Sequence, residues 1–179
     1  MTKEEIIEEI RVAFKDVRLE DGVGLWEGQG LDDRADIQAL LELRKKDERN
    51  DWNNITDKDL ASCESSLYFL DAKGTRFCIP KFLIADIIKK DPGVLLVIDL
   101  QHYFNNERDD HQGKFSLFNG RQIQCIIYYL EYRMDEMIEE YKEYSVEYGS
   151  VADAVFSDPS YKELSNTVRT WKQKLIEFE

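Results

Sequence analysis

Cysteine, histidine and basic residues are scarce in this chain. Its 179 residues include three cysteines and two histidines, and 24 Lys and Arg stand against 37 Asp and Glu, for a net charge of −13. Nucleic-acid binding depends on clustered Lys and Arg, so this charge argues against a nucleic-acid partner. It argues equally against binding to an anionic membrane surface. A basic protein partner is compatible with the charge.

The two histidines do not form a metal-binding pattern. His111 lies beside Asp109 and Asp110, and His102 could join it across a polar loop. However, the chain has no His-x-x-x-His pair and no Cys/His cluster with ligand spacing. We therefore expect a solvated loop here, with no bound metal and no cofactor.

Long apolar runs are missing as well. Runs such as 94–98 and 125–130 are far too short to cross a bilayer, and the first residues carry no signal-peptide pattern. Cys63, Cys78 and Cys125 are odd in number and widely spaced. This favours free, buried thiols in a reducing compartment over a disulfide framework. We therefore predict a cytoplasmic protein.

Helical periodicity dominates what is present. Helices are predicted over residues 3–17, about 33–48, 56–63, 80–88 and 120–146, and from residue 159 onward. Capping patterns support four of these starts: Thr2 with Glu5, Thr56, Asn119, and Asp158 before Pro159. The expected inner face of the second helix consists of Ile37, Leu40, Leu41 and Leu43.

Two stretches are harder to place. Residues 94–104 fit either a buried strand or a helix, and the spacing from Leu96 onward favours the helix. Residues 22–30 contain four glycines around Trp26. A phosphate-binding loop is rejected there, because no Gly-Lys-Ser/Thr follows and Asp32 and Asp33 would compete with phosphate. We predict a flexible loop that carries a partly buried Trp26.

Residues 65–88 are expected to organise the core. Residues 71–74 have the composition of a turn, and Pro80 suits the first turn of a helix, so a small hairpin is expected near residues 67–79. Phe69, Phe77, Ile79 and Phe82 should form the middle of the core. The sequence thus predicts a mainly α protein, a single domain over residues 1–179 with about six helices and at most one small β-hairpin.

Several motifs resemble a family of uncharacterised bacterial proteins. They are Trp52-x-x-Ile55, SLxFLDAxGxRFxIP over residues 66–80, FSLFxxxQ over 115–122 and YLEY over 129–132. The resemblance covers roughly residues 45–133 and does not cover the acidic stretch after Tyr132. Cys78 departs from it, since the family more often has an aromatic residue there. The family has no established activity, so the resemblance implies no catalytic residue.

No catalytic constellation is recognisable. Each cysteine lies in apolar surroundings without a histidine nearby in sequence, and buried thiols are usually inert. Arg76 is the most informative charge, because it lies within the apolar 65–88 segment. It could bind an anionic ligand, but we favour an ion pair with a buried acid such as Asp71 or Asp86.

The helix predicted over 120–146 carries a second stripe beside its apolar face. Tyr128 and Tyr132 lie on this stripe, and an acidic region follows them. Tyrosine is enriched in binding surfaces, and an acidic face suits a basic partner. The candidate binding residues are Tyr128, Tyr132, Glu136, Glu139, Glu140 and Glu143.

Three functional hypotheses remain open. The first is a non-catalytic module that binds a basic protein through this acidic surface, such as an immunity or antitoxin-type inhibitor. The second is an enzyme or small-ligand sensor with a pocket around Arg76. The third is a homo-oligomer in which the long final helices pair.

Overall fold

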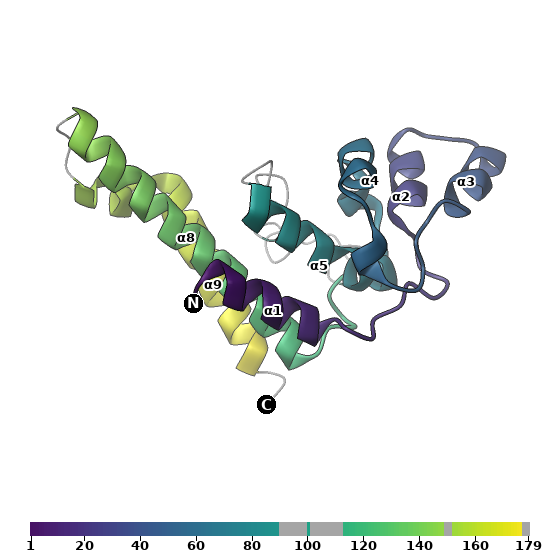
Figure 1. The fold of residues 1–179 in the computed structure, drawn as a ribbon, viewed down its shortest axis with the longest axis horizontal. Coiled ribbons are helices and arrows are strands. Elements are labelled where there is room, and N and C mark those ends of the chain that lie inside the picture. Colours follow the sequence, from purple (N-terminus) through teal and green to yellow (C-terminus); the bar gives the residue numbers. More distant parts are fainter. Residues whose placement is uncertain (90–99, 101–112, 149–151, 177–179) are drawn as a thin grey trace. The chain divides into compact units, whose positions relative to one another are not determined.

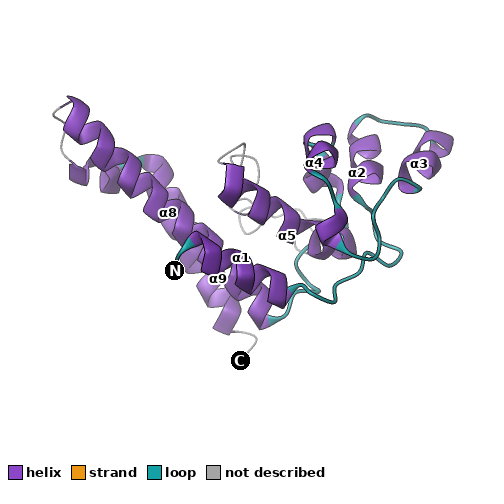
Figure 2. Cartoon of the chain, in the orientation of Figure 1, coloured by secondary structure: helices purple, strands orange, loops and turns teal. Residues whose placement is uncertain are grey.

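A computed structural model describes residues 1–89, 100, 113–148 and 152–176, and every regular element in these ranges is a helix (Figures 1 and 2). Seven α-helices and three 3-10 helices lie there, so the prediction of a mainly α fold is confirmed. The chain divides into two compact units, residues 10–118 and residues 1–9 with 119–179. The prediction of a single domain stays a prediction. Residues 94–104 and both histidines fall outside the described residues, apart from the buried Leu100.

The unit of residues 10–118 contains most of the short helices. They are the end of α1 (Lys3–Ala13), α2 (Leu25–Asp32), α3 (Ile37–Arg44), η1 (Trp52–Asn54), α4 (Asp57–Ser62), η2 (Ser66–Phe69) and α5 (Ala72–Lys89). Trp52 is 1% exposed and donates its indole N–H to the Phe14 carbonyl oxygen at 2.8 Å. The Phe14 and Phe118 rings meet edge to face, with centroids 5.8 Å apart. The buried indole therefore has the hydrogen-bond partner that its burial requires.

The glycine-rich stretch is a helix, so the prediction of a flexible loop over residues 22–30 is wrong. α2 begins at Leu25 and packs against η2 and α3. Glycine in a helix costs about 1 kcal/mol relative to alanine. Here it permits close packing, because a Cβ at Gly30 would overlap the side chains of Leu43 and Leu40 on α3. The packing of α2 against α3 thus outweighs the low helix propensity of glycine.

α2 ends in a Schellman motif, which separates it from α3. The Arg34 N–H donates to the Leu31 carbonyl at 3.2 Å, and the Ala35 N–H donates to the Gly30 carbonyl at 2.9 Å. Arg34 adopts the left-handed conformation that this motif requires, with a φ of 56°. α3 then begins at Ile37 and ends at Arg44. The single helix predicted over about 33–48 is therefore too long.

Only part of the expected inner face of α3 is covered. Leu40 and Leu43 are half-buried, whereas Ile37 is 79% exposed and Leu41 is 50% exposed. The contact of Leu40 and Leu43 with Gly30 decides which side of α3 faces the protein. Periodicity alone could not show which of these four residues are covered and which are exposed to solvent.

α5 replaces both the hairpin expected near residues 67–79 and the helix expected to begin at Pro80. Asp71 caps it: its Oδ1 accepts the Gly74 N–H at 2.7 Å, and its carbonyl accepts the Thr75 N–H at 2.8 Å. The helix consequently starts at Ala72 and contains Pro80, although an internal proline normally costs about 3 kcal/mol. Among the expected core residues Phe77 and Ile79 are buried, while Phe69 and Phe82 are half-buried.

The unit of residues 1–9 and 119–179 is built mainly on two long helices. α8 (Gly120–Tyr148) packs along α9 (Pro159–Ile176), and η3 (Ala152–Ser157) precedes α9 (Figure 1). Lys172 on α9 pairs with Glu131 on α8 at 2.6 Å. Buried apolar residues on these two helices include Ile123, Ile126, Leu130, Leu164, Val168 and Trp171.

The caps predicted at the starts of α1, α8 and α9 are confirmed. The Thr2 N–H donates to the Glu5 carboxylate at 2.8 Å, and the Glu5 N–H donates to the Thr2 hydroxyl at 3.2 Å. Asn119 accepts the Gln122 N–H at 3.0 Å. Asp158 accepts the Ser160 N–H at 2.7 Å, directly before α9. Local sequence therefore fixes where these helices begin.

Replacing Arg34 by glycine should stabilise the protein. A residue with a Cβ loses about 1–2 kcal/mol in the left-handed conformation, and the greater freedom of glycine in the unfolded chain offsets part of the gain. We expect the free energy of unfolding, measured by urea denaturation, to rise by up to about 1 kcal/mol. Arg34→Ala removes the same side chain but keeps the Cβ, so it should give no gain. Equal effects of the two substitutions would contradict the prediction.

Candidate functional site

Arg76 lies on α5, where it is half-buried, and its Nε has no hydrogen-bond partner in the described ranges. Among the described residues, no ion pair joins Arg76 to Asp71 or Asp86. The Asp71 carboxylate instead accepts the N–H groups of Gly74 and Val23, at 2.7 and 3.2 Å. Asp86 is buried, and it lies about 15 Å from Arg76 along the axis of the same helix. An anion site at Arg76 stays a prediction.

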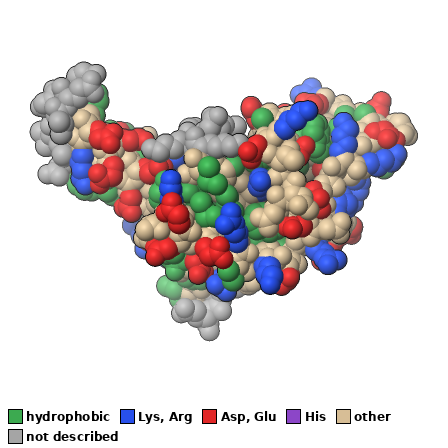
Figure 3. Space-filling view, viewed as in Figure 1, with side chains coloured by type: hydrophobic (Ala, Val, Ile, Leu, Met, Phe, Trp, Pro, Cys, Tyr) green, Lys and Arg blue, Asp and Glu red, His purple; other side chains and the backbone are tan. Residues whose placement is uncertain are grey.

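The six candidate binding residues all lie on α8. Tyr128, Tyr132, Glu136, Glu139 and Glu143 follow one another at spacings of four or three residues and so share one side of the helix, which Glu140 flanks. We call this set the acidic stripe. Both tyrosines and Glu136 are half-buried, while Glu139, Glu140 and Glu143 are exposed. Figure 3 shows acidic side chains gathered over α8.

Cations neutralise only part of the acidic stripe. The Tyr132 hydroxyl donates to Glu136 at 2.6 Å, and Arg133 pairs with the same carboxylate at 2.9 Å. Lys142 pairs with Glu139 at 2.7 Å. In the part of the chain that the structure describes, no cation pairs with Glu140 or Glu143. The stripe therefore ends in carboxylates that face water.

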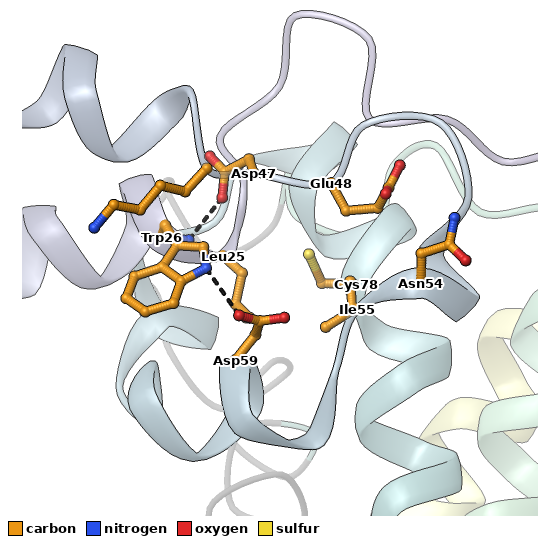
Figure 4. Close-up of a pocket in the computed structure, with 9 residues that line it drawn as sticks. Leu25, Trp26, Asp47, Glu48, Asn54, Ile55, Asp59 and Cys78 are labelled. Carbon is orange, nitrogen blue, oxygen red and sulfur yellow. Dashed lines mark hydrogen bonds between the residues drawn. The ribbon is translucent and has the colours of Figure 1, made fainter.

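The unit of residues 10–118 contains a pocket that the sequence did not predict. Its volume is about 200 Å³, and polar side chains from α2, α4 and the segment between α3 and α4 surround it (Figure 4). Nine residues line it: Leu25, Trp26, Lys46, Asp47, Glu48, Asn54, Ile55, Asp59 and Cys78. Arg76 is not among them, so the pocket expected around Arg76 is not the one found here.

Asp47 joins this pocket to the start of α2. The residue before the helix, Gly24, has no side chain to cap it. Instead Asp47 Oδ1 accepts the Trp26 N–H at 2.7 Å, and a Cβ at Gly24 would overlap the Asp47 carboxylate. Glycine is required at position 24 because a distant carboxylate occupies the space of its missing side chain. That carboxylate also interacts favourably with the positive end of the helix.

Trp26 connects Asp47 to the second pocket carboxylate. Its indole N–H donates to Asp59 Oδ1 at 3.3 Å (Figure 4). Asp59 is held in place by a capping box, in which its Oδ2 accepts the Thr56 hydroxyl at 2.6 Å and the Thr56 N–H at 3.0 Å. The Lys46 ammonium lies over the Trp26 ring, 4.9 Å from the ring centroid. The ring face therefore already holds a cation.

The two aspartates of the pocket have opposite shifts in pKa. Burial raises the pKa of Asp47 to about 6, although the N–H groups of Trp26 and Glu27 oppose the change. Burial would also raise the pKa of Asp59, but hydrogen bonds from Thr56 and the Trp26 indole outweigh it and leave this pKa below its usual value. Asp59 is therefore ionised at neutral pH, and Asp47 titrates close to neutrality.

The pocket offers little for covalent chemistry. Cys78 lines the pocket, and burial raises its pKa well above the usual range, so this thiol stays protonated. Burial also raises the pKa of Cys63, which does not line the pocket, to about 12. Protonated thiols are poor nucleophiles. Each aspartate is already fixed by a backbone N–H or a capping box. Among the described residues no group of three or more His, Cys, Asp or Glu is placed to hold a metal ion.

Part of this site was predictable from the sequence. The half-burial of Trp26 and the helix start at Thr56 were both predicted, and the structure confirms them. Nothing in the local sequence marks Asp47, because its role depends on Gly24, which lies in a different part of the chain. The capping pattern around Asp59 was the only signal within reach, and it indicated a helix start rather than a pocket.

These features define an all-α protein with an acid-lined pocket in one unit and an acidic stripe in the other. The sequence matches the model of a family of unknown function (DUF6714) over residues 2–154, and the chain belongs to that family. The match extends beyond the motif resemblance at both ends, so most of the acidic stretch after Tyr132 lies within the family. No curated protein and no solved structure matches the chain significantly. No described helix has the length and apolar character of a membrane-spanning segment.

Replacing Asp47 by asparagine should change how stability depends on pH. The folded-state pKa of about 6 exceeds the unfolded value of about 3.9, so the Asp47 contribution to stability is complete at low pH and is lost as pH rises through 6. The neutral amide can still accept the Trp26 N–H. We expect the free energy of unfolding of Asp47→Asn to exceed that of the wild type by a margin that widens by about 1 kcal/mol between pH 5 and pH 8.

Urea denaturation across this pH range measures the margin, and Asp16→Asn, at an exposed aspartate outside the pocket, is the matched control. The whole range from pH 5 to pH 8 lies above the isoelectric point of the protein, which is about 4.7. A margin that stays constant or narrows with rising pH would show that burial does not disfavour the Asp47 carboxylate.

Proposed function

We propose that this protein is a non-catalytic binding module that presents the acidic stripe of α8 to a basic protein. The observation that carries the proposal is the end of the stripe, where Glu140 and Glu143 are exposed and no described cation pairs with them. Residues 131–148 contain seven acidic and two basic side chains. Both bases, Arg133 and Lys142, are already paired within α8. The excess negative charge is therefore available to an external partner.

The tyrosines at the start of the stripe suit the same role. Tyr128 and Tyr132 are half-buried, so part of each ring is fixed by the protein while the rest meets solvent. A stiff, amphipathic side chain of this kind gives contact area at small cost in conformational entropy. The Tyr132 hydroxyl is held by Glu136 at 2.6 Å. The stripe thus combines anchoring side chains with charges that steer a basic partner.

A cytoplasmic inhibitor of the immunity or antitoxin type is one concrete instance. Such a protein acts by covering a cationic active site and needs no chemistry of its own. The buried, free thiols of Cys63, Cys78 and Cys125 are compatible with a reducing compartment. The high pKa of Cys63 and the fixed aspartates of the pocket also agree with a role that is not catalytic.

Removing the exposed charges of the stripe should weaken partner binding. We expect Glu139→Gln, Glu140→Gln and Glu143→Gln together to lower the affinity about tenfold, because each exposed charge pair contributes roughly 0.2–1 kcal/mol. The partner is first captured from a lysate of the source organism at low salt and identified as a basic protein. Its dissociation constant is then measured with purified proteins at low and high salt, and binding should weaken with salt.

The matched control carries Glu4→Gln, Glu64→Gln and Glu163→Gln, which remove the same charge at exposed positions outside the stripe. This control should keep nearly the wild-type affinity. The proposal fails if no basic protein is captured at low salt, or if the two triple variants weaken binding equally.

A further inference from the structure

We propose that the exposed side of α3 is a docking surface for a second copy of this chain, and that the end of the acidic stripe on α8 docks there. The contact is heterologous, since each copy offers α3 to one neighbour and α8 to another. It shares Glu140 and Glu143 with the proposed function but does not require that function, because no other protein takes part.

One side of α3 is apolar and uncovered. Leu40 and Leu43 contact the position of Gly30 on α2, whereas Ile37 is 79% exposed and Leu41 is 50% exposed. Ile37 and Leu41 are four residues apart and therefore lie next to each other on the helix surface. Exposed apolar side chains that adjoin in this way, with charged residues around them, are typical of protein–protein contacts.

A hollow beside these two side chains carries positive charge. Its volume is about 430 Å³, and it is lined by Gln38, Leu41, Glu42, Arg44, Lys45 and Arg49. Three of these six side chains are cations and one is a carboxylate, although the whole chain has a net charge of −13. Figure 3 shows Lys and Arg side chains gathered on the α3 side of this unit. The hollow therefore suits an acidic partner.

The positive charge of the hollow is only partly compensated. The Arg49 guanidinium donates to two backbone carbonyl oxygens, and among the described residues no carboxylate pairs with it. Lys45 follows Leu41 by four residues and so continues the row of exposed side chains. It pairs with Glu42 at 2.6 Å, but both side chains are more than half exposed. Such a pair contributes little, so Lys45 can pair with an incoming carboxylate instead.

The end of α8 has the complementary chemistry. Glu140 and Glu143 are exposed, and no described cation pairs with either. Tyr144 is 54% exposed and lies four residues after Glu140, so these two side chains form a row along the helix. The exposed row on α3 has the same spacing, and rows of this spacing interlock in the commonest class of helix packing. The tyrosine ring then covers the apolar side chains while the carboxylates face the cations of the hollow.

The mass of the purified protein in solution is the first measurement. Two short rows of side chains make a small contact, so we expect a dissociation constant on the order of 100 μM. Sedimentation equilibrium of the full chain, at physiological ionic strength and from about 10 μM to about 1 mM, should show a mass that rises above that of the monomer. Chains with a net charge of −13 repel one another, so general electrostatics cannot produce such a rise.

Two variants separate the two halves of the contact. Ile37→Glu with Leu41→Glu places carboxylates on α3 and keeps α8, whereas Glu140→Lys with Glu143→Lys reverses the charge of α8 and keeps α3. Each variant alone should self-associate about tenfold more weakly than the wild type. An equimolar mixture should form a 1:1 complex of nearly wild-type affinity, because the α8 of the first fits the α3 of the second. Both variants keep a negative net charge, so this complex requires the specific contact.

Matched controls make the same changes elsewhere. Val12→Glu with Ile176→Glu alters two exposed apolar residues outside α3. Glu64→Lys with Glu163→Lys reverses two exposed charges outside the acidic stripe. Both controls should self-associate within about twofold of the wild type, because distant exposed charges are screened. Circular dichroism and urea denaturation of each variant establish that it is folded.

Three results would overturn the inference. The first is a wild type that stays monomeric over the whole concentration range, which would leave the α3 surface to a different acidic protein or to solvent. The others are a mixture without a complex, and controls that lose self-association as the two variants do. The affinity for a captured basic protein is a separate readout, since Ile37→Glu with Leu41→Glu should not change it. Failure of the proposed function is thus distinguishable from failure of self-association.

Discussion

The first turn of α2 is capped by a side chain from a distant part of the chain. Asp47 accepts the Trp26 N–H, and its carboxylate occupies the space that a side chain at Gly24 would fill. This contact fixes the start of α2, and it fixes the path of the segment after α3. It also buries the carboxylate beside Trp26 and Lys46. The place of Asp47 in the pocket wall follows from this interaction, whereas burial raises the pKa of Asp47 and the Trp26 N–H opposes that rise.

The two units carry their negative charge in different ways. In the unit of residues 10–118, the carboxylates of Asp47, Asp59 and Asp71 face inward or hold helix starts, where backbone N–H groups compensate them. On α8, Glu140 and Glu143 project into water. An acidic composition therefore reflects two physical roles. Carboxylates of the first kind stabilise the fold, and only those of the second kind are free to act on a partner over a distance.

The sequence predicted most reliably the features that depend on a few neighbouring residues. The caps at Thr2, Thr56, Asn119 and Asp158 all form, because each needs only the next turn of its own helix. The structure differs from the predicted helices where a contact with another part of the chain decides whether a segment is helical. Residues 71–74 have the composition of a turn but form the start of α5. The glycines of residues 22–30 lie in or beside α2, where neighbouring groups approach them closely.

Composition, periodicity and capping patterns together determined that this protein is helical, that α8 and α9 are long, and that α8 carries a tyrosine-bearing acidic stripe. These properties are local, since spacing along one helix decides which residues share a side. The tertiary structure alone decided that Ile37 and Leu41 are exposed, that Arg76 lacks its expected ion pair, and that Asp47 caps α2. The cap of α2 depends on a contact between different segments of the chain, and the exposed side of α3 depends on how α3 packs against α2. Such contacts leave no local pattern to read.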